Sequence, residues 1–167
     1  MSVTNNSFEY KLNKEINSLF NEPEMAGYAI KHNRNITYSD FFDDKMMVIA
    51  AIRAGIPYSM FDVIQDNAPF TEDNWAVFLD ISTKSLQRYK TADAFHFKAI
   101  HSEKILEMAE VTNVGLDVFG SMEKLKLWLN TPSYALGSLK PIDLIGDSYG
   151  KELVISELTR INYGILV

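Results

Sequence analysis

Apolar residues recur at helical spacing along most of this chain, and that periodicity is the feature that most limits its fold. Phe8, Leu12, Ile16 and Phe20 fall at every fourth position, which places them on one face of a helix. No stretch alternates apolar and polar residues, with β-branched enrichment, over the length of a strand. The sequence therefore predicts an all-α fold, in which the first stripe is either core packing or the seam of a dimer.

Capping residues indicate where these helices begin and end. A side chain that accepts a hydrogen bond from the first free N–H groups favours a helix start, and glycine or proline favours an end. Ser39 is expected to cap one helix over residues 40–54, with Gly55 as its stop. A long helical pattern covers residues 93–120. Further helix starts are expected at Thr71, Ser82, Ser121 and Asp147.

Two of the expected helices are separated by a short break, which is the layout of a helix-turn-helix. They cover residues 72–79 and 83–93. Gln87 and Arg88 would face outward and can bond to base edges, and Lys84 and Thr83 can contact phosphates. Many helix pairs share this layout without binding DNA, so the pattern alone leaves the function open.

The charge of the chain argues against nucleic-acid binding by its whole surface. It carries 22 acidic and 16 basic residues, a net charge of -6. Residues 81–104 differ, because they hold five basic residues against two acidic ones. That stretch is either a local phosphate-binding face or a solvated helix face.

Several functional classes lack the residues that they need. Without cysteine the chain has no disulfide, thiolate metal site or cysteine nucleophile. Its glycines show no phosphate-loop spacing, and His96 and His101 are five residues apart, not at the spacing of a helical metal pair. We therefore expect no catalytic residues, no metal and no cofactor, and a binding protein rather than an enzyme.

No segment of the chain has the sequence pattern of a signal peptide or of a membrane-spanning helix. The N-terminus lacks the basic-then-apolar order of a signal peptide. The longest apolar run, Met46 to Ile52, is far shorter than the roughly 20 residues that a spanning helix needs. We expect a soluble, cytoplasmic protein that does not contact a membrane.

The C-terminal third carries a series of motifs in one order. Together they resemble the C-terminal domain of the Xre/MbcA/ParS antitoxin family. The segment "ISTKSLQRYK" upstream also resembles the helix-turn-helix of that family, so the resemblance covers roughly residues 55–167. The matching positions are Phe119-Gly120, Trp128-Leu129, Asn130 with Pro132, Leu136-Gly137 with Pro141, Leu144, Gly150 with Val154, and Arg160-Ile161-Tyr163-Gly164.

Two positions depart from the family pattern. Ser138 stands where the family often has a second glycine, and Asp80 stands where the helix-turn-helix turn usually has one. Asp tolerates a left-handed backbone better than most residues, so we expect the turn to be kept. The recognition helix is also less basic than is usual, which predicts weaker DNA binding.

The resemblance implies a type II antitoxin whose partner is a RES-domain toxin. Such a toxin has a fold similar to ADP-ribosyltransferases and either consumes NAD or modifies a target with it. The resemblance also implies an Xre-like helix-turn-helix domain (55–115) and a small helical toxin-binding domain (116–167). The first 50 residues match no known pattern, and we expect the N-terminal helical segment (1–54) to serve dimerisation. The antitoxin would cover the NAD pocket of the toxin and, as a homodimer within a larger complex, bind operator DNA and repress its own operon. The DNA contacts would be Thr83, Lys84, Gln87 and Arg88.

The chain end is the expected toxin contact. Leaving its last three aliphatic residues in water costs about 25 cal/mol per Å² of apolar surface, and a partner cleft would relieve that cost. We expect the toxin to be contacted by Arg160, Tyr163, Ile165, Leu166 and Val167. Trp128, Leu136 and Val154 are instead expected in the core of the small domain.

Two alternatives belong to other functional classes. The chain could be a helix-turn-helix transcriptional regulator without a toxin partner. It could also be an interaction module whose helix-turn-helix no longer binds DNA.

Overall fold

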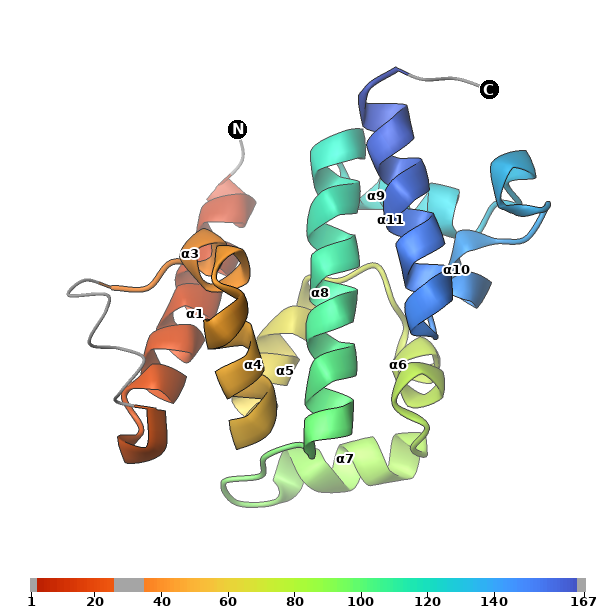
Figure 1. The fold of residues 1–167 in the computed structure, drawn as a ribbon. Coiled ribbons are helices and arrows are strands. Elements are labelled where there is room, and N and C mark those ends of the chain that lie inside the picture. The colour runs from red at the N-terminus through yellow and green to blue at the C-terminus, as the bar shows by residue number, and fades with distance from the viewer. Residues whose placement is uncertain (1–2, 26–34, 165–167) are drawn as a thin grey trace. The chain divides into compact units, whose positions relative to one another are not determined.

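Every regular element in residues 3–25 and 35–164, which the computed structural model describes, is helical (Figure 1). The expected all-α fold is confirmed. The chain divides into two compact units, residues 1–67 with 84–105 and residues 68–83 with 106–167. Helix α8 (Ala99–Phe119) begins in the first unit and ends in the second. None of the described helices is long and apolar enough to cross a membrane.

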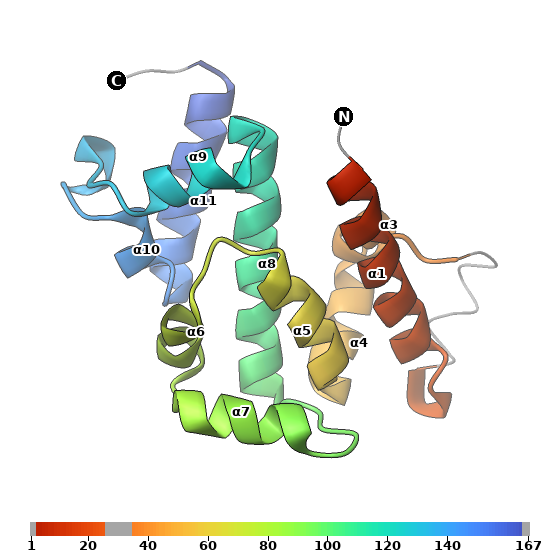
Figure 2. The ribbon, with the colours of Figure 1, turned by 180° about the vertical axis from the view of Figure 1, so that it is seen from behind.

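The first unit is built around the apolar stripe of the N-terminal helix. Leu12, Ile16 and Phe20 are fully buried and Phe8 is half-buried, so the stripe is core packing. The helix that carries it, α1, packs on α5 and α3, and Figure 2 shows α1 beside α5. The helical elements of this unit before α8 are α1 (Val3–Phe20), η1 (Pro23–Met25), α3 (Tyr38–Asp43), α4 (Lys45–Ala54), α5 (Tyr58–Asp66) and α7 (Thr83–Thr91).

The single helix expected over residues 40–54 is wrong, because the chain breaks at Asp44. Thr37, not Ser39, caps α3, and it forms a capping box with Asp40. Asp44 has an extended backbone, and its carboxylate accepts hydrogen bonds from the N–H groups of Met46 and Met47. A carboxylate that satisfies the first N–H groups of a new helix favours a second start there. The expected stop at Gly55 is confirmed, with φ of 88°.

The long helix expected over residues 93–120 is also too long at its start. Residues 93–98 are not helical, and α8 begins at Ala99. Backbone pairing holds this stretch instead, because Tyr58 N–H donates to Phe95 O and Phe97 N–H donates to Ile56 O, each at 2.9 Å. The Phe97 ring is buried against Phe61, with ring centroids 5.1 Å apart. Tertiary contacts therefore outweigh the local helical pattern here.

In the second unit, α11 (Ser148–Asn162) lies beside the second half of α8 in both views (Figures 1 and 2). Lys151 Nζ and Glu110 Oε2 join the two helices at 2.8 Å, and Val154 and Leu158 are buried between the elements of the unit. Thr71, Ser121 and Asp147 cap their helices as expected. The remaining elements are α6 (Glu72–Leu79), α9 (Met122–Leu129), η2 (Tyr134–Leu136) and α10 (Pro141–Leu144).

Candidate functional site

The turn that precedes α7 keeps the conformation expected of a glycine although it holds an aspartate. Asp80 is left-handed, with φ of 52° and ψ of 45°. Its N–H donates to the carbonyl of Val77, and Ile81 N–H donates to the carbonyl of Ala76 at 3.1 Å. These bonds end α6 with its last carbonyls satisfied. Residues 80–82 therefore form the short break that the helix-turn-helix pattern requires.

Helix α7 presents three of the four predicted DNA contacts to solvent. Lys84, Gln87 and Arg88 are exposed, and Thr83 is half-buried. Leu86 is buried at 2% exposure and anchors the opposite face of the helix. The predicted contacts thus lie on the polar side of an amphipathic helix, where a groove of DNA could reach them.

The local charge of α7 differs from that of the chain as a whole. The helix, TKSLQRYKT, has three cations and no carboxylate. The Arg88 guanidinium also lies over the Tyr89 ring, with its carbon 5.5 Å from the ring centroid. A guanidinium held by an aromatic face has fewer orientations to lose on binding. This arrangement suits phosphate contacts by Lys84 and base contacts by Gln87 and Arg88.

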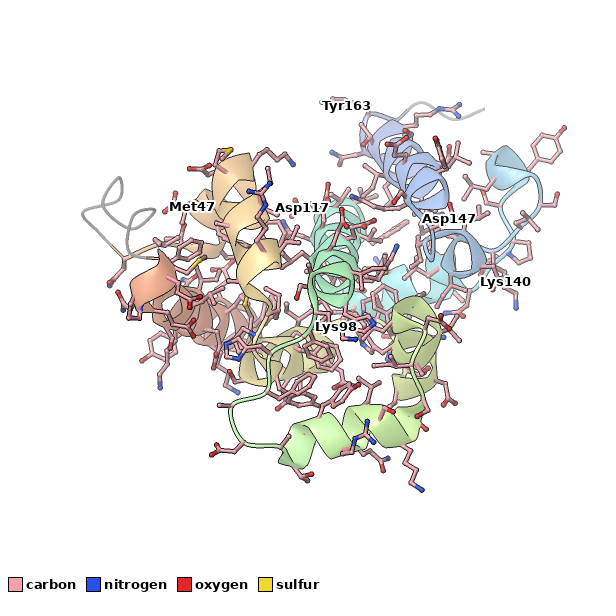
Figure 3. The ribbon with its side chains drawn as sticks, turned by 60° about the horizontal axis from the view of Figure 1, so that its bottom comes forward. Met47, Lys98, Asp117, Lys140, Asp147 and Tyr163 are labelled. Atoms are coloured by element: carbon pink, nitrogen blue, oxygen red, sulfur yellow. The ribbon has the colours of Figure 1, made fainter. Side chains whose placement is uncertain are left out.

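A second surface runs along α11. Counting positions by the helical repeat places five residues on one side: Tyr149, Leu153, Ser156, Arg160 and Tyr163, which we call the α11 face. Tyr149 is 84% exposed, Leu153 56% and Tyr163 76%. Figure 3 labels Asp147 at the start of the helix and Tyr163 at its end. Val154 and Leu158 on the opposite side of α11 are buried, so the α11 face exposes two tyrosines and a leucine beside Ser156 and Arg160.

Arg160 is placed by an ion pair within the same helix. Its Nη1 lies 3.2 Å from Glu157 Oε2, and the arginine side chain is 38% exposed. Arg160 and Tyr163, two of the residues expected to contact the toxin, lie close together at the end of α11. Tyr149 and Leu153 were not among the expected contacts, although their spacing from Arg160 puts them on the same helix face. Ile165, Leu166 and Val167 lie outside the described residues.

The residues predicted as core of this unit behave mostly as expected. Val154 is fully buried and Leu136 is 8% exposed. Trp128 is half-buried, with its ring 5.7 Å from that of Phe119. Gly137 is left-handed with φ of 69°, which confirms the loop geometry expected there. These residues pack in the interior of the unit, and the α11 face remains exposed.

Comparison with known families assigns the two parts of the chain that carry α7 and α11. Residues 47–110 match the antitoxin Xre-like helix-turn-helix domain. Residues 115–164 match the antitoxin Xre/MbcA/ParS C-terminal toxin-binding domain. The chain belongs to the Xre/MbcA/ParS antitoxin family. It is thus a type II antitoxin, of a non-enzymatic class, with a helix-turn-helix and a toxin-binding domain.

A solved structure shows the same fold. This antitoxin is similar to a chain in the crystal structure of the M. tuberculosis MbcT-MbcA toxin-antitoxin complex, with a TM-score of 0.51 and 18% identity. The similarity covers 64% of this antitoxin and 94% of that chain. No curated protein matches the sequence. Residues 1–46, which include α1 and α3, lie outside both family matches.

Proposed function

We propose that this antitoxin neutralises a RES-domain toxin by covering its NAD pocket, and that it represses its own operon through α7. The observation that carries the first half is the α11 face, which lies within the matched toxin-binding domain. Tyr163 and Arg160 lie at its end, directly before the aliphatic residues Ile165 to Val167. In the sequence, a charged residue and an aromatic residue thus come just before three aliphatic residues.

The chemistry of the α11 face suits a protein partner. Tyrosine and arginine are enriched among the residues that contribute most binding energy at interfaces. Two exposed tyrosines and Leu153 also offer apolar area that gains free energy when water is removed. The acidic balance of the chain, net -6, favours a toxin pocket lined with basic residues. In this proposal the tail and Tyr163 enter the pocket while the rest of the face packs on its rim.

Repression of the operon rests on α7. Its polar side holds Lys84, Gln87 and Arg88 without a competing carboxylate on the helix. A single helix with three cations gives few phosphate contacts, so one copy would bind DNA weakly. Two copies on adjacent half-sites would raise the effective affinity, and we therefore propose a homodimer within a larger complex with the toxin. Operator and toxin would both be met in the cytoplasm.

We propose three functional segments: 1–54 for dimerisation, 55–115 for DNA and 116–167 for the toxin. Because the stripe of α1 is buried, contact between copies would use other side chains of the first segment. Tyr10 on α1 is 69% exposed, and Met46 and Ile49 on α4 are 56% and 38% exposed. These are the apolar groups that a dimer contact could cover.

Co-expression tests the toxin half of the proposal. The protein encoded beside this antitoxin is induced with the full-length chain, or with a chain that lacks Ile165 to Val167, while growth and cellular NAD are followed. Rescue by the full-length chain, weakened without the tail, supports the proposal. A neighbour that does not slow growth, or one that the full-length chain does not rescue, contradicts it and favours a DNA-binding regulator without a toxin partner.

A further inference from the structure

The loop that carries η2 is held closed by its own backbone. Ser133 N–H donates to Leu139 O at 3.0 Å, and Ser138 N–H donates to Ser133 O at 2.8 Å. Gly137 and Ser138 are both left-handed, with φ of 69° and 63°, which turns the chain back sharply. Leu136 is buried and fixes the loop to its unit. Residues 133–139, which we call the closed loop, therefore have one backbone shape before any partner arrives.

The closed loop presents an aromatic ring at its surface. Tyr134 is 89% exposed, more than any other large apolar or aromatic side chain of the described residues, and Leu139 is 51% exposed. In both views the loop projects from its unit on the side away from α8 (Figures 1 and 2). An exposed tyrosine on a loop of fixed shape is costly to hydrate and has little freedom to lose on binding.

The sequence around the closed loop is free of charge. Residues 127–139 contain no charged side chain, although 23% of the chain is charged. The centres of protein interfaces are depleted in charge and enriched in tyrosine. Residues 127–139 have no cation that could bind a DNA phosphate, so a protein is a better partner for this stretch than a nucleic acid.

We infer that the closed loop is a second toxin anchor, in which Tyr134 enters an apolar pocket on the toxin surface. This inference rests on the proposed function and extends it beyond the α11 face. The partner is the toxin because the loop lies inside the matched toxin-binding domain, residues 115–164. The loop contributes affinity by its fixed shape, and the α11 end contributes the contact at the NAD pocket.

Binding of the purified neighbouring protein to the full-length antitoxin, measured by calorimetry, tests this inference. Tyr134→Ala is expected to weaken binding by about 30-fold, as for a central anchor residue. Ile100→Ala is the matched control, because Ile100 on α8 is also highly exposed, at 71%, but lies outside the toxin-binding domain. It is expected to bind as the unsubstituted chain does. Circular dichroism shows that both variants keep their helices.

A second variant tests the fixed shape of the loop. Gly137→Val strains the left-handed position and is expected to weaken toxin binding while Tyr134 is still present. Equal affinity of Tyr134→Ala and the unsubstituted chain overturns the inference but leaves the proposed function intact. No binding by the unsubstituted chain overturns both. A change in self-association of Tyr134→Ala without a change in toxin affinity assigns the loop to contact between copies and also overturns it.

Discussion

Gly150 shows how a single residue fixes the join between two helices of the toxin-binding domain. A Cβ at this position would overlap the carbonyl oxygen of Leu144, the last residue of α10. The first turn of α11 can therefore approach α10 closely only because the side chain is absent. Asp147 completes the join, since its carboxylate accepts the Gly150 N–H at 2.7 Å.

Gly150→Ala is predicted to lower the free energy of unfolding by about 1–3 kcal/mol, because the methyl group meets backbone that cannot move aside. Gly146→Ala is the matched control, since a Cβ there has nothing within 4 Å. Urea denaturation of both variants measures the difference. Equal loss of stability at the two positions would show that close approach at Gly150 is not what matters.

Some of the residues with a left-handed backbone could be predicted from the sequence and others could not. Asp80 was expected to keep a turn that usually holds glycine, and its φ of 52° confirms this. Ser138 has φ of 63° at the other position where the family often has glycine, so both departures keep the glycine-like backbone. Ala94, with φ of 49°, was not foreseen. Its conformation depends on pairing between residues 56–58 and 95–97, which are distant in sequence.

At the scale of elements, helix starts that depend on neighbouring residues could be predicted from the sequence. Features that depend on tertiary contacts could not. Caps at Thr71, Ser121 and Asp147 were found because each depends on a side chain and an N–H group a few residues away. The break at Asp44 was missed because Ser39 offered a competing cap. Residues 93–98 were predicted as helix because their pairing partners, Ile56 and Tyr58, lie about 40 residues earlier in the chain and cannot be seen in the local pattern. Of the α11 face, the sequence indicated Arg160 and Tyr163 but not Tyr149 or Leu153.

Ile16→Ala tests the role assigned to α1. The side chain is fully buried, so truncation is predicted to cost about 2–5 kcal/mol of unfolding free energy. Lys11→Ala, on the exposed side of the same helix, is predicted to change stability little. Denaturation is followed together with sedimentation. A change in oligomeric state without loss of stability would show that the stripe is a dimer seam instead.

Helix α7 carries the prediction for DNA. Lys84→Ala is predicted to weaken operator binding for all sequences and to reduce the slope of log affinity against log salt by about 1, because one phosphate contact is lost. Arg88→Ala is predicted to relax the preference at one base pair by about 1–3 kcal/mol. Lys14→Ala, an exposed cation on α1, serves as the control. Unchanged operator binding by both α7 variants would support an interaction module that no longer reads DNA.

At the scale of the whole molecule, the proposed function requires one chain to bind two partners of opposite charge, DNA and a basic toxin surface. The net charge of -6 disfavours DNA, and the cations of α7 are too few for strong binding by one copy. In the proposed function, three of the 16 basic residues lie on α7, without a carboxylate on that helix, and the acidic remainder of the chain suits a basic partner. We propose that two copies of the chain on one operator supply the affinity that a single helix lacks.

The spacing between the two half-sites tests whether two copies of the chain bind one operator together. Moving one half-site by about 5 bp turns it to the other face of the duplex, since a helical turn is about 10–10.5 bp. Operator affinity is predicted to fall by about 10²-fold or more, and restoration of a full turn is predicted to recover most of it. Affinity that does not depend on spacing would show that the copies bind independently. Gel-shift titrations at fixed salt make the comparison.

The central claim is that the end of α11 blocks the NAD pocket of the toxin. Its most direct test is the rate of NAD consumption by the purified neighbouring protein as the antitoxin and NAD are varied. We expect inhibition that excess NAD relieves, with the apparent KM raised and kcat unchanged, and weaker inhibition without Ile165 to Val167. A toxin that binds the antitoxin tightly and still consumes NAD at its full rate would contradict the account.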